Sequence, residues 1–150
     1  MSVWFKGESE HDCDIGRVRN ALESHGEFFV GVVSRMPGMT EVELVEQTSD
    51  AVTIRTNEGL MDRTNISKRL EDDRVVMEFD ERYEAGSSVT VTSHYSHEFA
   101  QSDTGVTHRI VISDVETRGF MGFFYRRFGS SKMGTAVLTA HKAYFDKPVV

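Results

Sequence analysis

The chain has 150 residues and a mass of 17.0 kDa, a size typical of one domain with an interior large enough for a core or a hollow core. Hydrophobic residues make up 39% and charged residues 27%, which excludes a disordered or collagen-like chain. The net charge of −7 disfavours a nucleic-acid partner, because the phosphate backbone attracts basic proteins. The single cysteine, Cys13, excludes an internal disulfide framework and a multi-thiolate metal site.

The sequence shows no membrane or targeting segment and no domain boundary. No stretch approaches the ~20 apolar residues of a membrane-spanning helix, and residues 1–6 lack the apolar segment of a signal peptide. We therefore expect a soluble, cytoplasmic protein without stable membrane insertion. The only prolines are Pro37 and Pro148, and no linker or internal repeat is evident, so we predict one domain over residues 1–150.

The N-terminal part of the chain predicts one strand followed by two short helices. Alternating residues indicate a strand over residues 3–10. Asp14 is a residue type that caps a first helical turn, and the apolar spacing after it predicts a helix that ends near residues 25–26. A second short helix is expected over residues 27–33, before the break at Pro37.

Strict alternation of polar and apolar residues dominates the middle of the chain. A period of two is typical of antiparallel strands with one buried face. The alternating runs predict six further strands, over residues 41–48, 51–56, 60–70, 74–84, 88–101 and 106–116. Residue types that favour turns separate several of these runs, so consecutive strands are expected to pair as hairpins.

Keeping the apolar faces of neighbouring strands together predicts their register. The predicted pairs for the last three hairpins are Thr64 with Glu81, Met77 with Tyr95, and Phe99 with His108. All three pairings place the same apolar residues on one face of the sheet.

The longest helical pattern covers residues 119–147, where apolar residues recur at steps of three and four. A helix of roughly twenty residues or more within this run extends over ~30 Å, which is enough to lie across a strongly bent sheet. The predicted class is therefore α+β, with a seven-stranded curved antiparallel sheet around a long C-terminal helix and two short helices after the first strand.

This order of elements resembles the helix-grip fold of the START-like (SRPBCC) superfamily, which includes polyketide cyclase/dehydrase-like proteins, lipid-transfer domains and the birch pollen allergen family. The resemblance extends over essentially the whole chain. It also rests on the segment 39–44, which follows the Pro37-Gly38 break, and on the aromatic segment 120–125. It implies a cavity between the sheet and the C-terminal helix that holds an apolar or aromatic small molecule.

Polar residues on the predicted concave face are the candidates for a site. They are Asp62, Lys68, Glu81, Tyr83, Ser93, Tyr95, His97 and His108. An unpaired carboxylate in an apolar cavity is costly, so Glu81 is expected to be hydrogen-bonded, paired or protonated, unless it lies at a solvated strand end. We predict that Glu81, Tyr95 and His97 orient a ligand. The other predicted ligand-binding residues are Tyr83, His108, Met77 and Phe79 on the sheet, and Phe124, Tyr125, Phe128 and Val137 on the C-terminal helix.

A metal or redox cofactor is not expected. The spacing of His94, His97 and Glu98 looks like a metal motif, but on a strand His94 and His97 point to opposite faces.

The sequence thus predicts a protein that binds a small hydrophobic or aromatic molecule, such as a lipid or a polyketide-like metabolite. One alternative is an enzyme of the cyclase or dehydratase type, with Glu81 or His97 as general base and Tyr95 as a donor to a developing oxyanion. Another is an interaction module similar to the chaperone co-activators of the same superfamily. The oligomeric state is left open, with a homodimer among the options.

Overall fold

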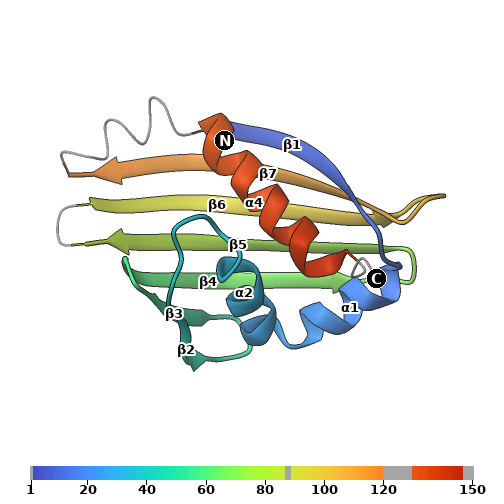
Figure 1. Cartoon of the computed structure of the whole chain (residues 1–150), viewed down its shortest axis with the longest axis horizontal. Helices are drawn as coiled ribbons and strands as arrows, with labels where there is room; N and C mark the ends of the chain where they lie inside the picture. The colour runs from blue at the N-terminus through green and yellow to red at the C-terminus, as the bar shows by residue number, and fades with distance from the viewer. Residues whose placement is uncertain (1, 87–88, 120–129, 147–150) are drawn as a thin grey trace.

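Every strand of the described structure belongs to one curved antiparallel sheet (Figure 1). The structure is a computed structural model that describes residues 2–86, 89–119 and 130–146. The strands are β1 (Val3–His11), β2 (Val42–Gln47), β3 (Val52–Thr56), β4 (Gly59–Leu70), β5 (Arg74–Ala85), β6 (Val89–Gln101) and β7 (Val106–Arg118). Their order is β1-β7-β6-β5-β4-β3-β2, so the first strand pairs with the last and the others pair as hairpins.

The helices lie on the concave face of this sheet. They are α1 (Ile15–Glu23), α2 (His25–Val33) and α4 (Ser130–Phe145). Figure 1 shows α4 crossing the sheet diagonally, from beside β1 towards α1. The cap predicted for α1 is present, because Asp14 Oδ1 accepts a hydrogen bond from the Arg17 backbone N–H at 3.0 Å. None of the described helices is long and apolar enough to cross a bilayer. The predicted helix-grip arrangement is confirmed.

The C-terminal helix of the described structure covers only part of the predicted span 119–147. α4 has 16 residues, which corresponds to a length of about 24 Å. Much of the rest of the prediction falls on residues 120–129, which lie outside the described residues.

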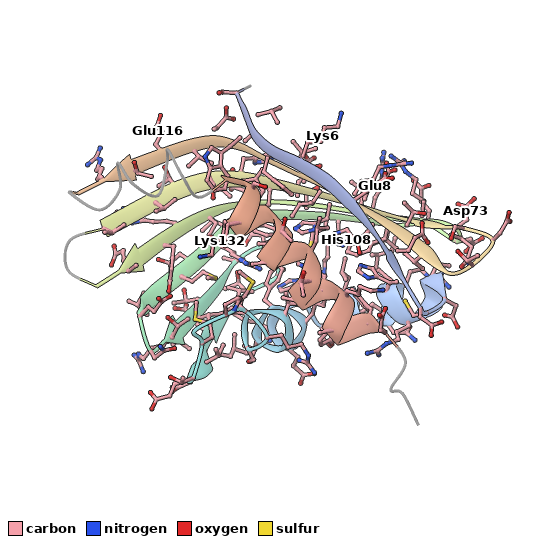
Figure 2. All side chains as sticks on the ribbon, turned by 45° about the horizontal axis from the view of Figure 1, so that its top comes forward. Lys6, Glu8, Asp73, His108, Glu116 and Lys132 are labelled. Atoms are coloured by element: carbon pink, nitrogen blue, oxygen red, sulfur yellow. The ribbon has the colours of Figure 1, made fainter. Side chains whose placement is uncertain are left out.

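Aromatic side chains from the sheet and the helices form much of the core. Phe29 of α2 contacts Phe79 of β5, with ring centroids 5.2 Å apart, and Phe145 of α4 contacts Phe99 of β6 at 5.7 Å. Figure 2 shows His108 of β7 in the same layer, beneath α4. Since these rings come from five separate elements, their burial holds the helices against the sheet.

The predicted register is confirmed for one hairpin and is wrong by two residues in the next. Phe99 pairs with His108, as predicted. Between β5 and β6, Met77 pairs with His97 rather than with Tyr95. The reason is that β5 extends to Ala85, which pairs across the turn with Val89. A shift of two residues keeps every side chain on its predicted face.

The predicted pairing of Thr64 with Glu81 is wrong because the strand contains a β-bulge at Asn65, and Thr64 pairs with Asp80 instead. The expected register holds where Lys68 pairs with Met77, but it shifts between Thr64 and Ser67. Asn65 has a φ of 54°, a backbone conformation that Asn tolerates better than most residues. The extra residue brings Arg63 opposite Glu81 and onto the concave face.

The same bulge explains why Asp62 does not belong to the concave face, contrary to the prediction. Asp62 Oδ1 instead accepts a hydrogen bond from Thr53 Oγ1 at 2.7 Å. The two flanking residues, Met61 and Arg63, are the buried ones.

We predict that Asn65→Gly is more stable than Asn65→Ala, which is the reverse of the order expected at a regular strand position. The positive φ penalises a Cβ by about 1–2 kcal/mol, so Asn65→Ala should be less stable than Asn65→Gly, and both lose the same side-chain hydrogen bond to Asp80. At Ser67, Ser67→Gly should be less stable than Ser67→Ala by about 0.5–1 kcal/mol. Urea unfolding of the four variants measures both differences, and the same order at both positions would contradict the bulge.

Candidate functional site

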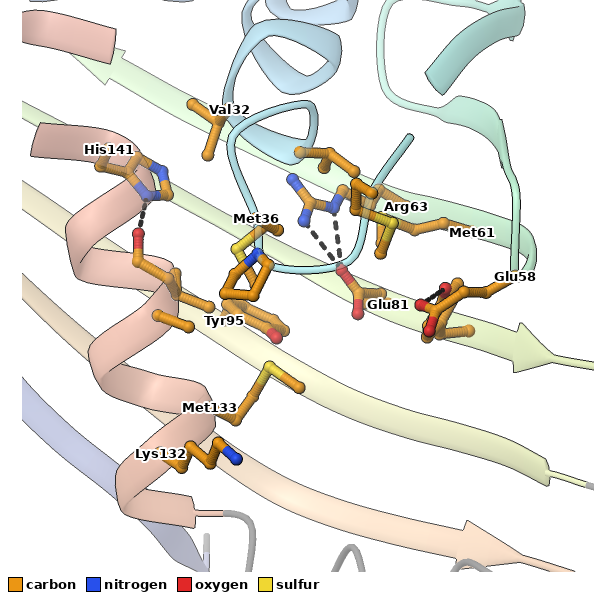
Figure 3. Close-up of a pocket in the computed structure, with 16 residues that line it drawn as sticks. Val32, Met36, Glu58, Met61, Arg63, Glu81, Tyr95, Lys132, Met133 and His141 are labelled. Carbon is orange, nitrogen blue, oxygen red and sulfur yellow. Dashed lines mark hydrogen bonds and ion pairs between the residues drawn. The ribbon is translucent and has the colours of Figure 1, made fainter. Parts of the chain in front are cut away.

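A cavity of about 340 Å³ lies between the sheet and α4, beside the C-terminal end of α2. Figure 3 shows its lining residues, which come from α2 and the loop after it, from the turn between β3 and β4, from β4, β5 and β6, and from α4. The apolar lining residues are Val32, Val33, Met36, Pro37, Met39, Met61, Met133, Ala136 and Val137, and the polar ones are Glu58, Arg63, Glu81, Tyr83, Tyr95, Lys132 and His141. The described walls are thus mainly apolar, with a few polar groups set into them.

Arg63 and Glu81 form a buried ion pair in the wall of the cavity. Nε and Nη2 of Arg63 each lie 2.9 Å from Oε2 of Glu81. The two side chains are only 9% and 8% exposed. The Arg63 guanidinium carbon also lies 4.5 Å from the ring centroid of Phe29 and 4.6 Å from that of Phe79. The faces of aromatic rings attract a cation, so Phe29 and Phe79 help the carboxylate to hold the guanidinium in place.

Tyr83 and Glu58 form a second polar pair in the lining of the cavity. The hydroxyl of Tyr83 donates to Oε1 of Glu58 at 2.6 Å and lies 3.2 Å from Oγ1 of Thr56. Burial, reinforced by this bond to a carboxylate, raises the pKa of the Tyr83 hydroxyl above its usual value. Tyr83 is therefore a neutral donor, and its bond fixes Glu58 in the turn between β3 and β4.

Four buried histidines lie where α4 packs on the sheet, three on strands and one on α4 itself. Nε2 of His11 is 3.0 Å from Nδ1 of His108, and Nε2 of His108 is 2.9 Å from Nδ1 of His97. The fourth, His141 of α4, donates its Nδ1–H to the Val137 carbonyl oxygen at 2.7 Å. Of the four, only His141 lines the cavity.

Burial lowers the pKa of all four histidines. It lowers the pKa of His11 to about 4 and that of His141 to about 3. The pKa values of His97 and His108 also fall well below the usual value, because burial disfavours the charged imidazolium. All four imidazoles are therefore neutral at neutral pH, with one N–H donor and one lone pair each.

The cavity takes in only part of the residue set predicted from the sequence. The predicted residues that line it are Glu81, Tyr83, Tyr95 and Val137. Those that share the concave face but lie outside the lining are Met77, Phe79, His97 and His108, each at most 1% exposed. Phe124, Tyr125 and Phe128 lie outside the described residues. Alternation thus identifies the buried face, whereas the helices that cover it decide which part is hollow.

Lys68 and Ser93, which were predicted on the concave face, are not among the residues that line the cavity. Nζ of Lys68 donates to the Leu22 carbonyl oxygen at 2.8 Å and to Nδ1 of His25 at 3.0 Å. It therefore satisfies the C-terminal end of α1. Ser93 is buried on β6, where it pairs with Glu81.

Sequence reasoning missed four polar residues of the lining: Glu58, Arg63, Lys132 and His141. The signal that could have found Arg63 was Asn65, because an asparagine within an alternating run tolerates the positive φ of a bulge. Such a bulge turns the residues before it to the other face. The signal for His141 was its position four residues after Val137, on the apolar stripe of the C-terminal helix.

Solved structures identify the fold to which this geometry belongs. A STAR-related lipid transfer protein from Xanthomonas axonopodis aligns with a TM-score of 0.58 at 12% identity, covering 93% of this chain and 84% of that one. The lipid transfer and protein localization domain of human StarD13 aligns with a TM-score of 0.55 at 14% identity, covering 96% and 77%. The chain has the START-like helix-grip fold.

A third structural match is a hypothetical protein from Helicobacter pylori, with a TM-score of 0.59 at 15% identity and coverage of 94% of this chain and 86% of that one. The sequence matches no family model and no curated protein sequence. At these identities the structural likeness shows the fold alone, and function has to be argued from the site.

We predict that Arg63 and Glu81 are energetically coupled. Arg63→Met or Glu81→Leu alone leaves a buried charge without its partner, which should reduce the free energy of unfolding by about 3–5 kcal/mol. The double variant replaces both charges by apolar side chains and should recover most of this loss. Urea unfolding of the four proteins gives the coupling energy. A double variant as unstable as the sum of the two single losses would show that the charges do not depend on each other.

Proposed function

We propose that the protein binds a compact apolar or aromatic molecule that carries an oxygen acceptor or an anionic group. The observation that carries this proposal is the cavity of about 340 Å³, whose described walls are mainly apolar and contain the Arg63–Glu81 pair. Ligand sites typically combine an apolar hollow with a few convergent polar groups.

The volume and lining of the cavity favour a small ligand. Ligand pockets have volumes of roughly 300–1,000 Å³, so this cavity is at the small end and fits one ring system or a short acyl chain better than a two-chain lipid. Its methionines are Met36, Met39, Met61 and Met133. Flexible thioether side chains adapt to ligands of different outline, and apolar contact contributes about 25 cal/mol per Å² buried.

Arg63 supplies the polar half of the proposed recognition. Its ion pair with Glu81 uses Nε and Nη2, which leaves Nη1 to donate to an oxygen of the ligand. The guanidinium is already held against Phe29 and Phe79, so little further conformational freedom is lost when the ligand binds. Lys132, on the α4 side of the cavity, adds a second positive charge.

An enzyme of the cyclase or dehydratase type is the second candidate, because Glu81 and Tyr95 both line the cavity. In this case Glu81 would act as the base. Glu81→Gln should then abolish turnover of a bound substrate, whereas simple binding should survive this change in weakened form. The co-activator alternative predicts a filled interior, and the cavity favours ligand binding over it.

We predict that filling the cavity weakens binding of 8-anilinonaphthalene-1-sulfonate, an aromatic probe with an anionic group. Ala136 lines the cavity, so Ala136→Phe should weaken binding at least about tenfold, which corresponds to about 1.4 kcal/mol. Ala143 is exposed on the same helix, and Ala143→Phe is the matched control that should leave binding unchanged. Fluorescence titration in the presence of EDTA gives both affinities.

Two outcomes of this titration would contradict a ligand site in the cavity. One is a wild-type protein that binds no probe, and the other is equal affinity in the two variants. Circular dichroism shows whether both variants are folded. Native mass spectrometry of freshly purified protein then identifies the natural ligand class from the mass of any co-purified molecule.

A further inference from the structure

A histidine cluster borders the cavity, and only one of its members, His141, lines it. The recognition proposed above assigns no role to these histidines. His97, His108 and His141 each bring a ring nitrogen within 4.8 Å of the ring nitrogens of the other two. They come from β6, β7 and α4, so the cluster forms only when the helix packs on the sheet. All three side chains are buried.

We propose that His97, His108 and His141 bind one divalent transition-metal ion, with Zn²⁺ as the best fit, and leave its fourth position open towards the cavity. Imidazole nitrogen is a preferred ligand of zinc, and sites with three protein ligands and one open position are the arrangement of catalytic zinc. His141 lies in the cavity wall, which provides both the entry path and the open side. This proposal replaces the sequence-based expectation that no metal is bound.

The distances between the ring nitrogens suit a tetrahedral ion after a small adjustment. Two nitrogens that bind one tetrahedral zinc at about 2.0–2.1 Å lie roughly 3.3 Å apart. Nδ1 of His97 and Nε2 of His108 are now 2.9 Å apart and share a hydrogen bond. An ion between them takes the place of the shared proton, and the neutral His97 ring then carries its proton on Nε2. No proton is released, because each ring only needs to be in the tautomer whose lone pair faces the ion.

Two of the three rings already have the outer hydrogen bonds that metal-binding histidines require. A ligating imidazole donates its other N–H to a carbonyl oxygen or another acceptor, which fixes the ring and its tautomer. His141 Nδ1 donates to the Val137 carbonyl oxygen at 2.7 Å. Nδ1 of His108 lies 3.0 Å from Nε2 of His11. In each case the remaining nitrogen, Nε2, is left with its lone pair for the cluster.

The positive charge that acts on the cluster is neutralised by an ion pair, so it does not prevent a metal cation from binding. The cation whose charge acts on His97 and His141 is Arg63, and its charge is offset by Glu81 at 2.9 Å. Three neutral imidazoles leave the charge of the ion uncompensated, which favours hydroxide or an anionic group of a cavity ligand in the fourth position.

Zinc titration of the EDTA-treated wild-type protein tests this site directly. We expect one Zn²⁺ per chain by calorimetry, and Co²⁺ in its place should give the visible absorption of a four-coordinate ion. In ¹⁵N spectra the ring nitrogens of His97, His108 and His141 should shift on addition of Zn²⁺, whereas those of His25 should not. A wild-type protein that binds no Zn²⁺, or binds it without shifts in these three rings, would overturn the proposal and leave a hydrogen-bonded histidine stack.

Variants separate this site from adventitious binding on the surface. His141→Leu removes a ligand and should weaken zinc binding by more than the roughly 10–100-fold expected for His11→Gln, which removes an outer partner. His94→Gln is the matched control, because His94 lies on the opposite face of the sheet, bonded to Asp80 and Glu78. Loss of zinc binding in His94→Gln with retention in His141→Leu would overturn the proposal. The titration needs no organic ligand, so its failure is distinguishable from failure of the cavity to bind one.

Discussion

Burial beneath the helices removes most of the water from the concave face of the sheet, so a polar group there is stable only if the protein supplies its partner. Arg63 and Glu81 satisfy each other, and two aromatic rings cover the guanidinium. His11, His108 and His97 hydrogen-bond one another in a row, and within the described residues only Nδ1 of His11 among their bonded rings is left without a partner. The interior therefore combines an apolar hollow with polar groups in fixed positions. Groups fixed before a ligand arrives are the requirement for selective recognition at low entropic cost.

The hairpin pairing of consecutive strands and the buried face could be predicted because they depend on local features. The side-chain period of a strand is two residues and survives in the sequence wherever one face is buried. That pattern placed Glu81, Tyr95, His97 and His108 on the concave face, where the structure has them. It failed at Asn65, because a bulge changes the period by one residue and its position depends on the φ of a single residue. Arg63 was consequently left out of the residues predicted for the concave face.

The cavity and the histidine cluster could not be predicted because both depend on how α4 packs against the sheet. The rotation of the helix decides that His141 faces the sheet and meets His97 and His108, which are distant in sequence. β1 is placed beside β7 by the sheet topology, which brings His11 to the same layer. Alternation also cannot show whether an apolar face is filled. The hollow exists where the side chains of α2 and α4 leave space, and only the packed structure reveals that.

The position of a bound molecule can be observed most directly by NMR on protein with ¹³C-labelled methionine methyl groups. Met36, Met39, Met61 and Met133 line the cavity, whereas Met77 is buried outside its lining. A ligand in the cavity gives intermolecular nuclear Overhauser effects from the ring protons of 8-anilinonaphthalene-1-sulfonate to the methyl groups of these four residues and none to Met77. Bound probe without contacts to any of the four would contradict a ligand site between the sheet and α4.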